Sequence, residues 1–200
     1  LNLTDTNTVL QGTGKQGNCG DFELSNTEYL INASNHVATI STGAYSAFGW
    51  INPESIAGNQ ATYGSGIFAN QASEADGSFG LTLKADGALW FYKWSGTNKR
   101  FKTDTTPCSS LATWYHVGIT YTGTGTDTAT IYVNGAPVAA TNDGGYASGW
   151  GTGAMIGVAY STPTSGYTFD GLIDEVGMWS KVLSAQEISD LYNGGAGIPY

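Results

Sequence analysis

The sequence predicts an all-β protein in which two antiparallel sheets pack face to face, with one short helix near the C-terminus. Three observations predict it. Short apolar runs alternate with polar residues, Gly, Asn, Asp and Pro separate these runs, and only 12% of the residues are charged, about half the usual share. The 200 residues fit one sandwich, and no repeat or linker divides them. We therefore expect a single domain over residues 1–200.

Two hairpins are the clearest local signals. Residues 79–83 and 89–94 flank Asp86-Gly87, and residues 128–133 lead through Asn134-Gly135 into Val138. Asp-Gly and Asn-Gly between alternating apolar runs favour tight hairpin turns. The sequence also predicts a turn at residues 52–55, and further strands at 22–24, 29–31, 44–51, 115–121, 155–158 and 172–179. This spacing is typical of a sandwich.

The one predicted helix begins after Ser184. Glu187 stands three residues later, which completes a capping box, and Leu183 and Ile188 have the spacing of a hydrophobic staple. Gly194-Gly195 can end the helix in left-handed geometry. We expect a short surface helix whose apolar face packs on the sandwich.

Charge and cysteine content limit the possible partners and compartments. Seven Lys and Arg stand against 16 Asp and Glu, a net charge of −9, which argues against nucleic acid and anionic membrane surfaces. No apolar run has the length of a bilayer-spanning helix. Cys19 and Cys108 are the only cysteines. A single disulfide between them is the prediction, with two separate buried thiols as the alternative.

Three stretches resemble the laminin-G-like, concanavalin A-like jelly roll of bacterial and phage surface proteins. They are residues 22–31 with 44–53, the Trp114-Tyr115-His116-Val117 strand with its partner ending in Val133-Asn134-Gly135, and residues 169–176 followed by the capped helix. The resemblance covers about residues 20–195. It implies a two-sheet antiparallel jelly-roll sandwich with one concave sheet, and with binding sites on the concave face or its rim.

The resemblance also implies a structural calcium ion. In similar domains an Asp at the position of Asp174 holds Ca²⁺ together with main-chain carbonyls of the N-terminal region, and such an oxygen shell suits this ion. The alternative is that Asp174 hydrogen-bonds backbone N–H groups and no metal binds. The N-terminal partner departs from the family pattern, because Phe22-Glu23-Leu24 stands where Phe-Asp-Gly is common.

Aromatic residues are the candidate ligand-binding groups. Trp90, Tyr92 and Trp94 alternate on one strand and so share a face, and sugar rings can stack on such side chains. A two-residue hairpin loop would bury them, whereas a three-residue loop would set Leu83 opposite Leu89 and turn them outward. The resemblance favours the outward register. Trp150 and Tyr160, in Gly-rich loops, complete the predicted site, although aromatics there can also pin loops to the scaffold.

Basic residues gather near the same strand. Lys93, Lys99 and Arg100 concentrate positive charge in a basic-poor chain. They could meet an acidic sugar, and ordinary solvated side chains are the alternative.

Catalysis is not expected. The superfamily's glycosidases carry Glu, Asp and Glu at alternating strand positions, and Glu74-Ala75-Asp76 is followed by Ser78 where the second Glu is needed. Asp174 and Glu175 are adjacent, so on a regular strand they point to opposite faces.

The sequence therefore predicts a non-catalytic carbohydrate-binding or adhesion module, extracellular, at a cell or virion surface. Its expected partner is a glycan or a surface protein, and we expect the chain to be part of a larger protein or assembly. The alternative is a structural decoration or appendage domain of a phage particle or surface filament that makes protein–protein contacts.

Overall fold

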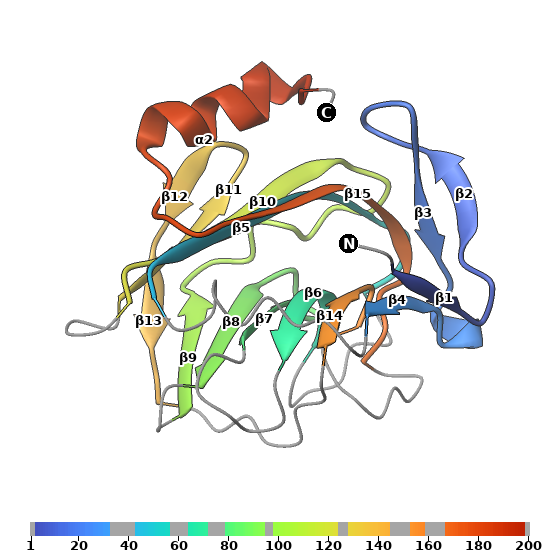
Figure 1. Ribbon diagram of the computed structural model, residues 1–200, viewed down its shortest axis with the longest axis horizontal. Coiled ribbons are helices and arrows are strands. Elements are labelled where there is room, and N and C mark those ends of the chain that lie inside the picture. Colours follow the sequence, from blue (N-terminus) through green and yellow to red (C-terminus); the bar gives the residue numbers. More distant parts are fainter. Residues whose placement is uncertain are drawn as a thin grey trace.

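Two stacked antiparallel sheets form the protein, as predicted (Figure 1). The computed structural model describes residues 3–32, 43–56, 64–71, 79–94, 98–123, 128–144, 153–158 and 167–198. One sheet has eight strands in the order β1-β4-β14-β6-β7-β8-β9-β13, and the other has seven in the order β12-β11-β10-β5-β15-β3-β2. The crossovers between consecutive strands give the jelly-roll topology.

The strand bounds are as follows. The eight-stranded sheet comprises β1 (Thr4–Thr6), β4 (Tyr29–Asn32), β14 (Gly153–Ile156), β6 (Ser65–Gln71), β7 (Phe79–Leu83), β8 (Leu89–Trp94), β9 (Asn98–Thr103) and β13 (Ala140–Asn142). The seven-stranded sheet comprises β12 (Ala136–Val138), β11 (Ala129–Val133), β10 (Tyr115–Tyr121), β5 (Tyr45–Pro53), β15 (Gly171–Trp179), β3 (Asn18–Phe22) and β2 (Leu10–Thr13).

The main core lies between the two sheets. It is rich in rings, with Tyr45 stacked on Phe79 at a centroid distance of 4.6 Å and Phe91 in contact with both Phe79 and Phe101. Large side chains such as these bury much apolar area each. The main contributors are alternate residues of β5, β7, β8 and β10, which is the inward half of each strand's period of two.

Both predicted hairpins form, and their loop lengths set the register. Leu83 pairs with Leu89, and the Lys84 N–H donates to the Ala88 carbonyl, which leaves a three-residue loop (85–87) in which Gly87 has a φ of +88°. Asn134 and Gly135, with φ of +51° and +77°, make a two-residue turn between β11 and β12. Asn and Gly accept such positive φ values most easily.

Helix α2 (Ala185–Tyr192) covers the outer face of the seven-stranded sheet (Figure 1). Its capping box forms as predicted, with the Ser184 side chain accepting from the Glu187 N–H and the Glu187 side chain accepting from the Ser184 N–H. Leu183 and Ile188 pack together on Phe48. Among the described ranges, no helix has the length and apolar content needed to cross a bilayer.

Several sequence-based expectations were wrong in detail. Residues 52 and 53 belong to β5 rather than to a turn, and the chain after Phe22 forms a 3₁₀ turn, η1 (Leu24–Asn26), rather than a strand. Strands β1, β2, β6, β9 and β13 were not anticipated, and neither was β3, which shares only Phe22 with the strand predicted at 22–24.

The predicted Cys19–Cys108 disulfide is absent. Both cysteines are buried free thiols, Cys19 on β3 and Cys108 against the β7–β8 turn, where its N–H donates to the Gly87 carbonyl. The alternative expectation of two separate buried thiols therefore describes the structure.

Candidate functional site

The candidate site lies on strands β7, β8 and β9, on the face of the eight-stranded sheet that points away from the seven-stranded one. Because Leu89 and Phe91 enter the core, the alternate residues Trp90 and Tyr92 point to this outer face. The outward register predicted for the hairpin is thus the observed one. Trp90 is partly exposed and has Thr82 on one side and Lys102 on the other.

Three cations surround the Trp90 indole. Lys84 Nζ lies 4.0 Å from the ring centroid, Arg100 Cζ 4.4 Å and Lys102 Nζ 5.4 Å. Each distance is within the range of a cation–π contact. We call Trp90, Lys84, Arg100 and Lys102 the Trp90 cluster.

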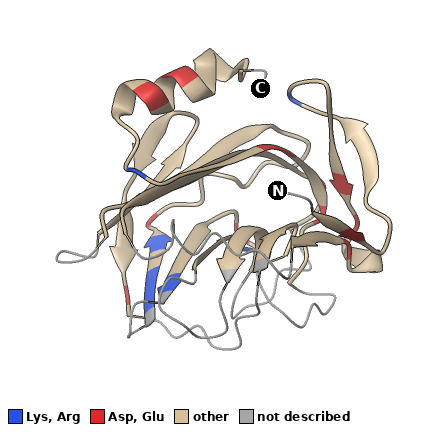
Figure 2. Ribbon diagram, viewed as in Figure 1, with Lys and Arg blue, Asp and Glu red and all other residues tan. Residues whose placement is uncertain are grey.

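The Trp90 cluster is the main basic region of an acidic protein. Figure 2 shows Lys and Arg gathered on β8 and β9, whereas Asp and Glu lie mostly on α2, β15 and the N-terminal strands. Lys93 and Lys99 alternate with the outward residues and pair with each other on the inner side of the sheet. Lys93 is 3% exposed, with its ammonium over the rings of Tyr45 and Tyr121. Of the predicted basic residues, only Arg100 therefore joins the site.

Asp143, just beyond β13, holds two of the cations. Arg100 Nε donates to its Oδ1 at 2.9 Å, a second guanidinium N–H donates to Oδ2, and Lys102 Nζ lies 3.1 Å from Oδ2. The Asp143 N–H also donates to the Arg100 carbonyl at 3.1 Å. Two parallel N–H···O bonds fix a carboxylate in the guanidinium plane. This bond to Asp143 raises the pKa of Arg100.

Tyr92 is not an exposed platform, which corrects its predicted role. Its side chain is 1% exposed, meets Trp90 edge-on at 6.1 Å, and hydrogen-bonds Arg100. It therefore helps to hold the Arg100 guanidinium in place. Next to it, the outer face around β6 and β14 is also buried, with Ala69 and Met155 packed on Val158.

The other predicted aromatics lie outside the description. Trp94 ends β8, but its side chain is not among those described, and Trp150 and Tyr160 lie outside the described residues. Glu74 and Asp76 fall there as well.

Asp174 is engaged by backbone groups. Its Oδ2 accepts from the Gln16 N–H at 2.9 Å and its Oδ1 from the Glu175 N–H at 2.9 Å, and the residue is 7% exposed. A Cβ added at Gly14 would lie 2.5 Å from Oδ2. Asp174 thus fastens the β2–β3 hairpin to β15 through backbone N–H groups.

A different acidic group has the spacing of a metal site. Ligand oxygens of Asp21, Glu23 and Glu54 all lie within 4.8 Å of one another. The group lies on the seven-stranded sheet, near the start of β15. The Oδ1 atoms of Asp21 and Asn52 are buried without a hydrogen-bond partner. Burial and the charges of Asp170, Asp21 and neighbouring glutamates raise the pKa of Glu23, and burial with Asp21 and Asp170 raises that of Glu54. Sequence reasoning missed this group because β3 and β5 bring its members together.

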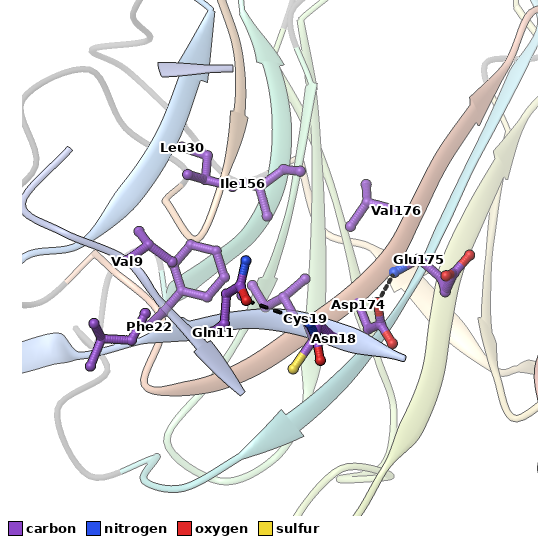
Figure 3. A pocket seen from close by; sticks show the side chains of 13 residues that line it. Val9, Gln11, Asn18, Cys19, Phe22, Leu30, Ile156, Asp174, Glu175 and Val176 are labelled. Atoms are coloured by element: carbon purple, nitrogen blue, oxygen red, sulfur yellow. Dashed lines mark hydrogen bonds between the residues drawn. The ribbon is translucent and has the colours of Figure 1, made fainter. Parts of the chain in front are cut away.

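A cavity of about 370 Å³ opens between the β2–β3 hairpin, β15 and the edge of the eight-stranded sheet (Figure 3). Val9, Phe22, Leu30, Ile156 and Val176 form its apolar lining, while Gln11, Asn18, Asp174 and Glu175 are polar.

Asp174 and Glu175 both line this cavity, at an irregularity of β15. The register of β15 against β5 shifts between Asp174 and Gly177, and Glu175 adopts a φ of +49°. A bulge of this kind breaks the strict alternation of a strand and re-aims its side chains. Burial and the charge of Asp174 raise the pKa of Glu175.

Comparison with known proteins agrees with this architecture. A laminin G family model, described as the concanavalin A-like lectin/glucanases superfamily, matches residues 25–189. A sequence search among curated proteins finds no match.

Solved structures with a similar fold share little sequence with this chain. Domain 4 of AbnA, an extracellular arabinanase of Geobacillus stearothermophilus, solved with arabinotriose, has a TM-score of 0.64 at 19% identity, over 94% of this chain and 86% of that one. A heptameric pentraxin of Limulus polyphemus gives 0.53 at 19% identity, over 76% and 70%.

The receptor-binding domain of botulinum neurotoxin mosaic serotype C/D gives a TM-score of 0.67 at 16% identity, over 96% of this chain and 46% of that one. This chain thus spans less than half of the toxin domain. The family match covers most of the sequence, and the two sheets have the family's architecture. The chain belongs to the concanavalin A-like lectin/glucanases superfamily.

Proposed function

We propose that this chain is a non-catalytic carbohydrate-binding or adhesion module that acts outside the cell, at a cell or virion surface. The observation that carries the proposal is the Trp90 cluster, a partly exposed indole ringed by hydrogen-bond donors on a rigid sheet. Ring edges and charged donors together suit a polyhydroxylated ligand, because sugars offer both C–H faces and oxygen acceptors. The arabinotriose complex of a similarly folded domain supports this reading.

The absence of catalysis in this proposal rests on how the carboxylates are used. A glycosidase needs one carboxyl group to protonate the leaving oxygen and a second to attack or to activate water. Asp143, which contacts the Trp90 cluster, is held in ion pairs, and both oxygens of Asp174 accept backbone N–H groups.

A structural calcium ion is the second part of the proposal. Ca²⁺ takes six to eight oxygens, as a rule, from carboxylates, carbonyls and water. Asp21, Glu23 and Glu54 fit that chemistry better than Asp174, because their oxygens converge while those of Asp174 are occupied by N–H donors. The ion would neutralise repelling carboxylates and link β3 to the end of β5 across β15.

A glycan array with matched tryptophan variants tests the binding function. The intact chain should bind at least one glycan, and Trp90→Leu should weaken that binding by about tenfold or more, the effect of losing one aromatic contact with its neighbours. Trp114→Leu is the matched control, because Trp114 is also partly buried but precedes β10 on the other sheet. Circular dichroism confirms that both variants fold. An array that stays blank with calcium and with chelator would remove the proposal.

One observation favours the alternative of a protein-contact domain. Leu10 is 58% exposed on β2, an edge strand of the seven-stranded sheet. An exposed edge with apolar side chains can pair with another chain. If this is the function, light scattering should show an oligomer that Leu10→Lys disperses, and the array should stay blank.

A further inference from the structure

We propose that the Trp90 cluster recognises a carboxylate group, so that the ligand is an acidic, uronate-containing glycan rather than a neutral one. This inference rests on the proposed function, since it names the ligand class of the same site. Three features of the Trp90 cluster support it. Three cations crowd around one ring, two of these cations are partly exposed, and the same two already hold a carboxylate.

The crowding argues against neutral sugar stacking. Three cationic groups within 5.4 Å of the Trp90 centroid occupy the surroundings of the ring that a sugar face would need. The ring quadrupole attracts them and so holds like charges close together. The result is a positively charged surface supported by an indole, and an anion is its complement.

The cations also repel one another, which an anionic ligand would relieve. Lys84 is 6% exposed, and burial lowers its pKa to about 8, with Arg100 and Lys102 adding to the effect and Asp86 opposing it. Lys102 and Arg100 lie nearer to solvent, with side chains 37% and 19% exposed. A ligand would meet these two groups, while the buried Lys84 contributes its charge from within 4.0 Å of the ring centroid.

Asp143 shows which anion the cluster accepts. It is a planar carboxylate held by two guanidinium N–H groups and by Lys102, the fork geometry that Arg uses for carboxylates. Its side chain is 23% exposed. A ligand carboxylate can bind beside Asp143 through the remaining Lys102 and Arg100 donors, because Lys has three N–H donors and Arg has five.

The test compares sugars that differ only in charge. Oligosaccharides of galacturonate, glucuronate and mannuronate are titrated by calorimetry beside their methyl esters, with neutral and sulfated oligosaccharides as further arms. At least one uronate should bind about tenfold or more tightly than its ester, because a charge-assisted hydrogen bond is lost on esterification. Raising the ionic strength should weaken this binding.

Matched variants tie the effect to the site. Lys102→Gln should weaken uronate binding by about tenfold, and Lys84→Met, which keeps the apolar stem, should weaken it as well. Lys99→Gln removes the same charge from the same strand, but its side chain is on the inner side of the sheet, so binding should stay within about twofold.

The outcomes are distinct. Equal binding of an acid and its ester, binding of neutral glycans alone, or binding of sulfated glycans alone would overturn the carboxylate assignment and leave glycan binding intact. Unchanged uronate binding in Lys102→Gln would place the ligand elsewhere. If no glycan of any class binds, the proposed function itself fails.

Discussion

The imidazole of His116 lies opposite the indole of Trp50 on neighbouring strands, with ring centroids 5.0 Å apart. Tyr192 of α2 stacks on both rings, at 5.8 Å from Trp50 and 6.1 Å from His116. His116 is 3% exposed, and burial lowers its pKa to about 4. The contact therefore depends on a neutral imidazole.

This burial predicts a loss of stability in mild acid. Between the ordinary histidine pKa of about 6.5 and the folded-state pKa of about 4, the unfolded chain binds a proton that the folded chain does not. Stability is therefore lost as the pH falls through this window, by up to about 3 kcal/mol. Urea unfolding at several pH values measures the loss.

His116→Phe isolates the contribution, because it keeps a ring and removes the titration. The difference in unfolding free energy between the wild type and this variant should change with pH only between about 4 and 6.5. A difference that is constant across this range would contradict the prediction.

Gly118 tests the packing beneath α2. A Cβ there would lie 2.1 Å from Phe48 Cδ1 and 2.6 Å from the Ala47 carbonyl oxygen, so Gly118→Ala should destabilise the fold by about 1–3 kcal/mol. Gly43→Ala is the control, since a Cβ at Gly43 meets nothing within 4 Å. Thermal melts of the two variants give the comparison, and equal melting temperatures would contradict the packing.

Glu54 tests the acidic group on β3 and β5. Its folded-state pKa is raised, so its charge lowers stability once the pH exceeds that pKa. At pH 7 without divalent ions, Glu54→Gln should raise the unfolding free energy by a few tenths of a kcal/mol, a small gain because solvent screens an exposed group. The gain should vanish in acid, where Glu54 is protonated.

Calcium should act on the same residues. At a hundredfold excess over its Kd, an ion that binds only the folded state adds about 2.7 kcal/mol. We expect Ca²⁺ to raise the melting temperature of the wild type, EDTA to reverse this, and Glu54→Gln to respond less. Asp190→Asn, which removes an exposed carboxylate from α2, should respond like the wild type. A response lost instead in Asp174→Asn would move the ion to Asp174.

The two thiols should be slow to react. Burial, together with Asp174 and Asp21, raises the pKa of Cys19 to about 11, and burial raises that of Cys108 to about 12. The thiolate is the nucleophile. Iodoacetamide should therefore label both cysteines much more slowly in the native protein than in denaturant. An intact mass lower by two hydrogens before reduction would indicate a disulfide instead.

Sequence patterns predicted the elements whose signals are local. The Asn134-Gly135 turn, the capped helix after Ser184 and the alternating strands at residues 79–83 and 89–94 all form. Strand β9 was missed because Lys99, Arg100 and Lys102 surround its single large core residue, Phe101. Because three charged residues flank one apolar residue, the sequence shows no alternation of apolar and polar residues there. Pairing with β8 stabilises the strand instead.

The candidate site also has one part that the sequence predicted and one part that it did not. The outward face of Trp90 depends on the length of one turn, for which the sequence allowed two lengths, and the family resemblance favoured the length that is observed. The cations around it come from β9 and from just after β7, and the acid from just beyond β13. Only strand pairing brings them within reach of one ring.

By itself, the sequence determined the sandwich, its main hairpins, its helix and the family to which the chain belongs. Tertiary structure alone decided that Tyr92 is buried, that both thiols are buried and free, and that Asp174 and Glu175 line the same cavity. The physical reason is the sequence separation over which each interaction acts. Turns, caps and alternation act within a few residues, whereas burial, charge clustering and the bulge in β15 depend on strands that are distant in sequence.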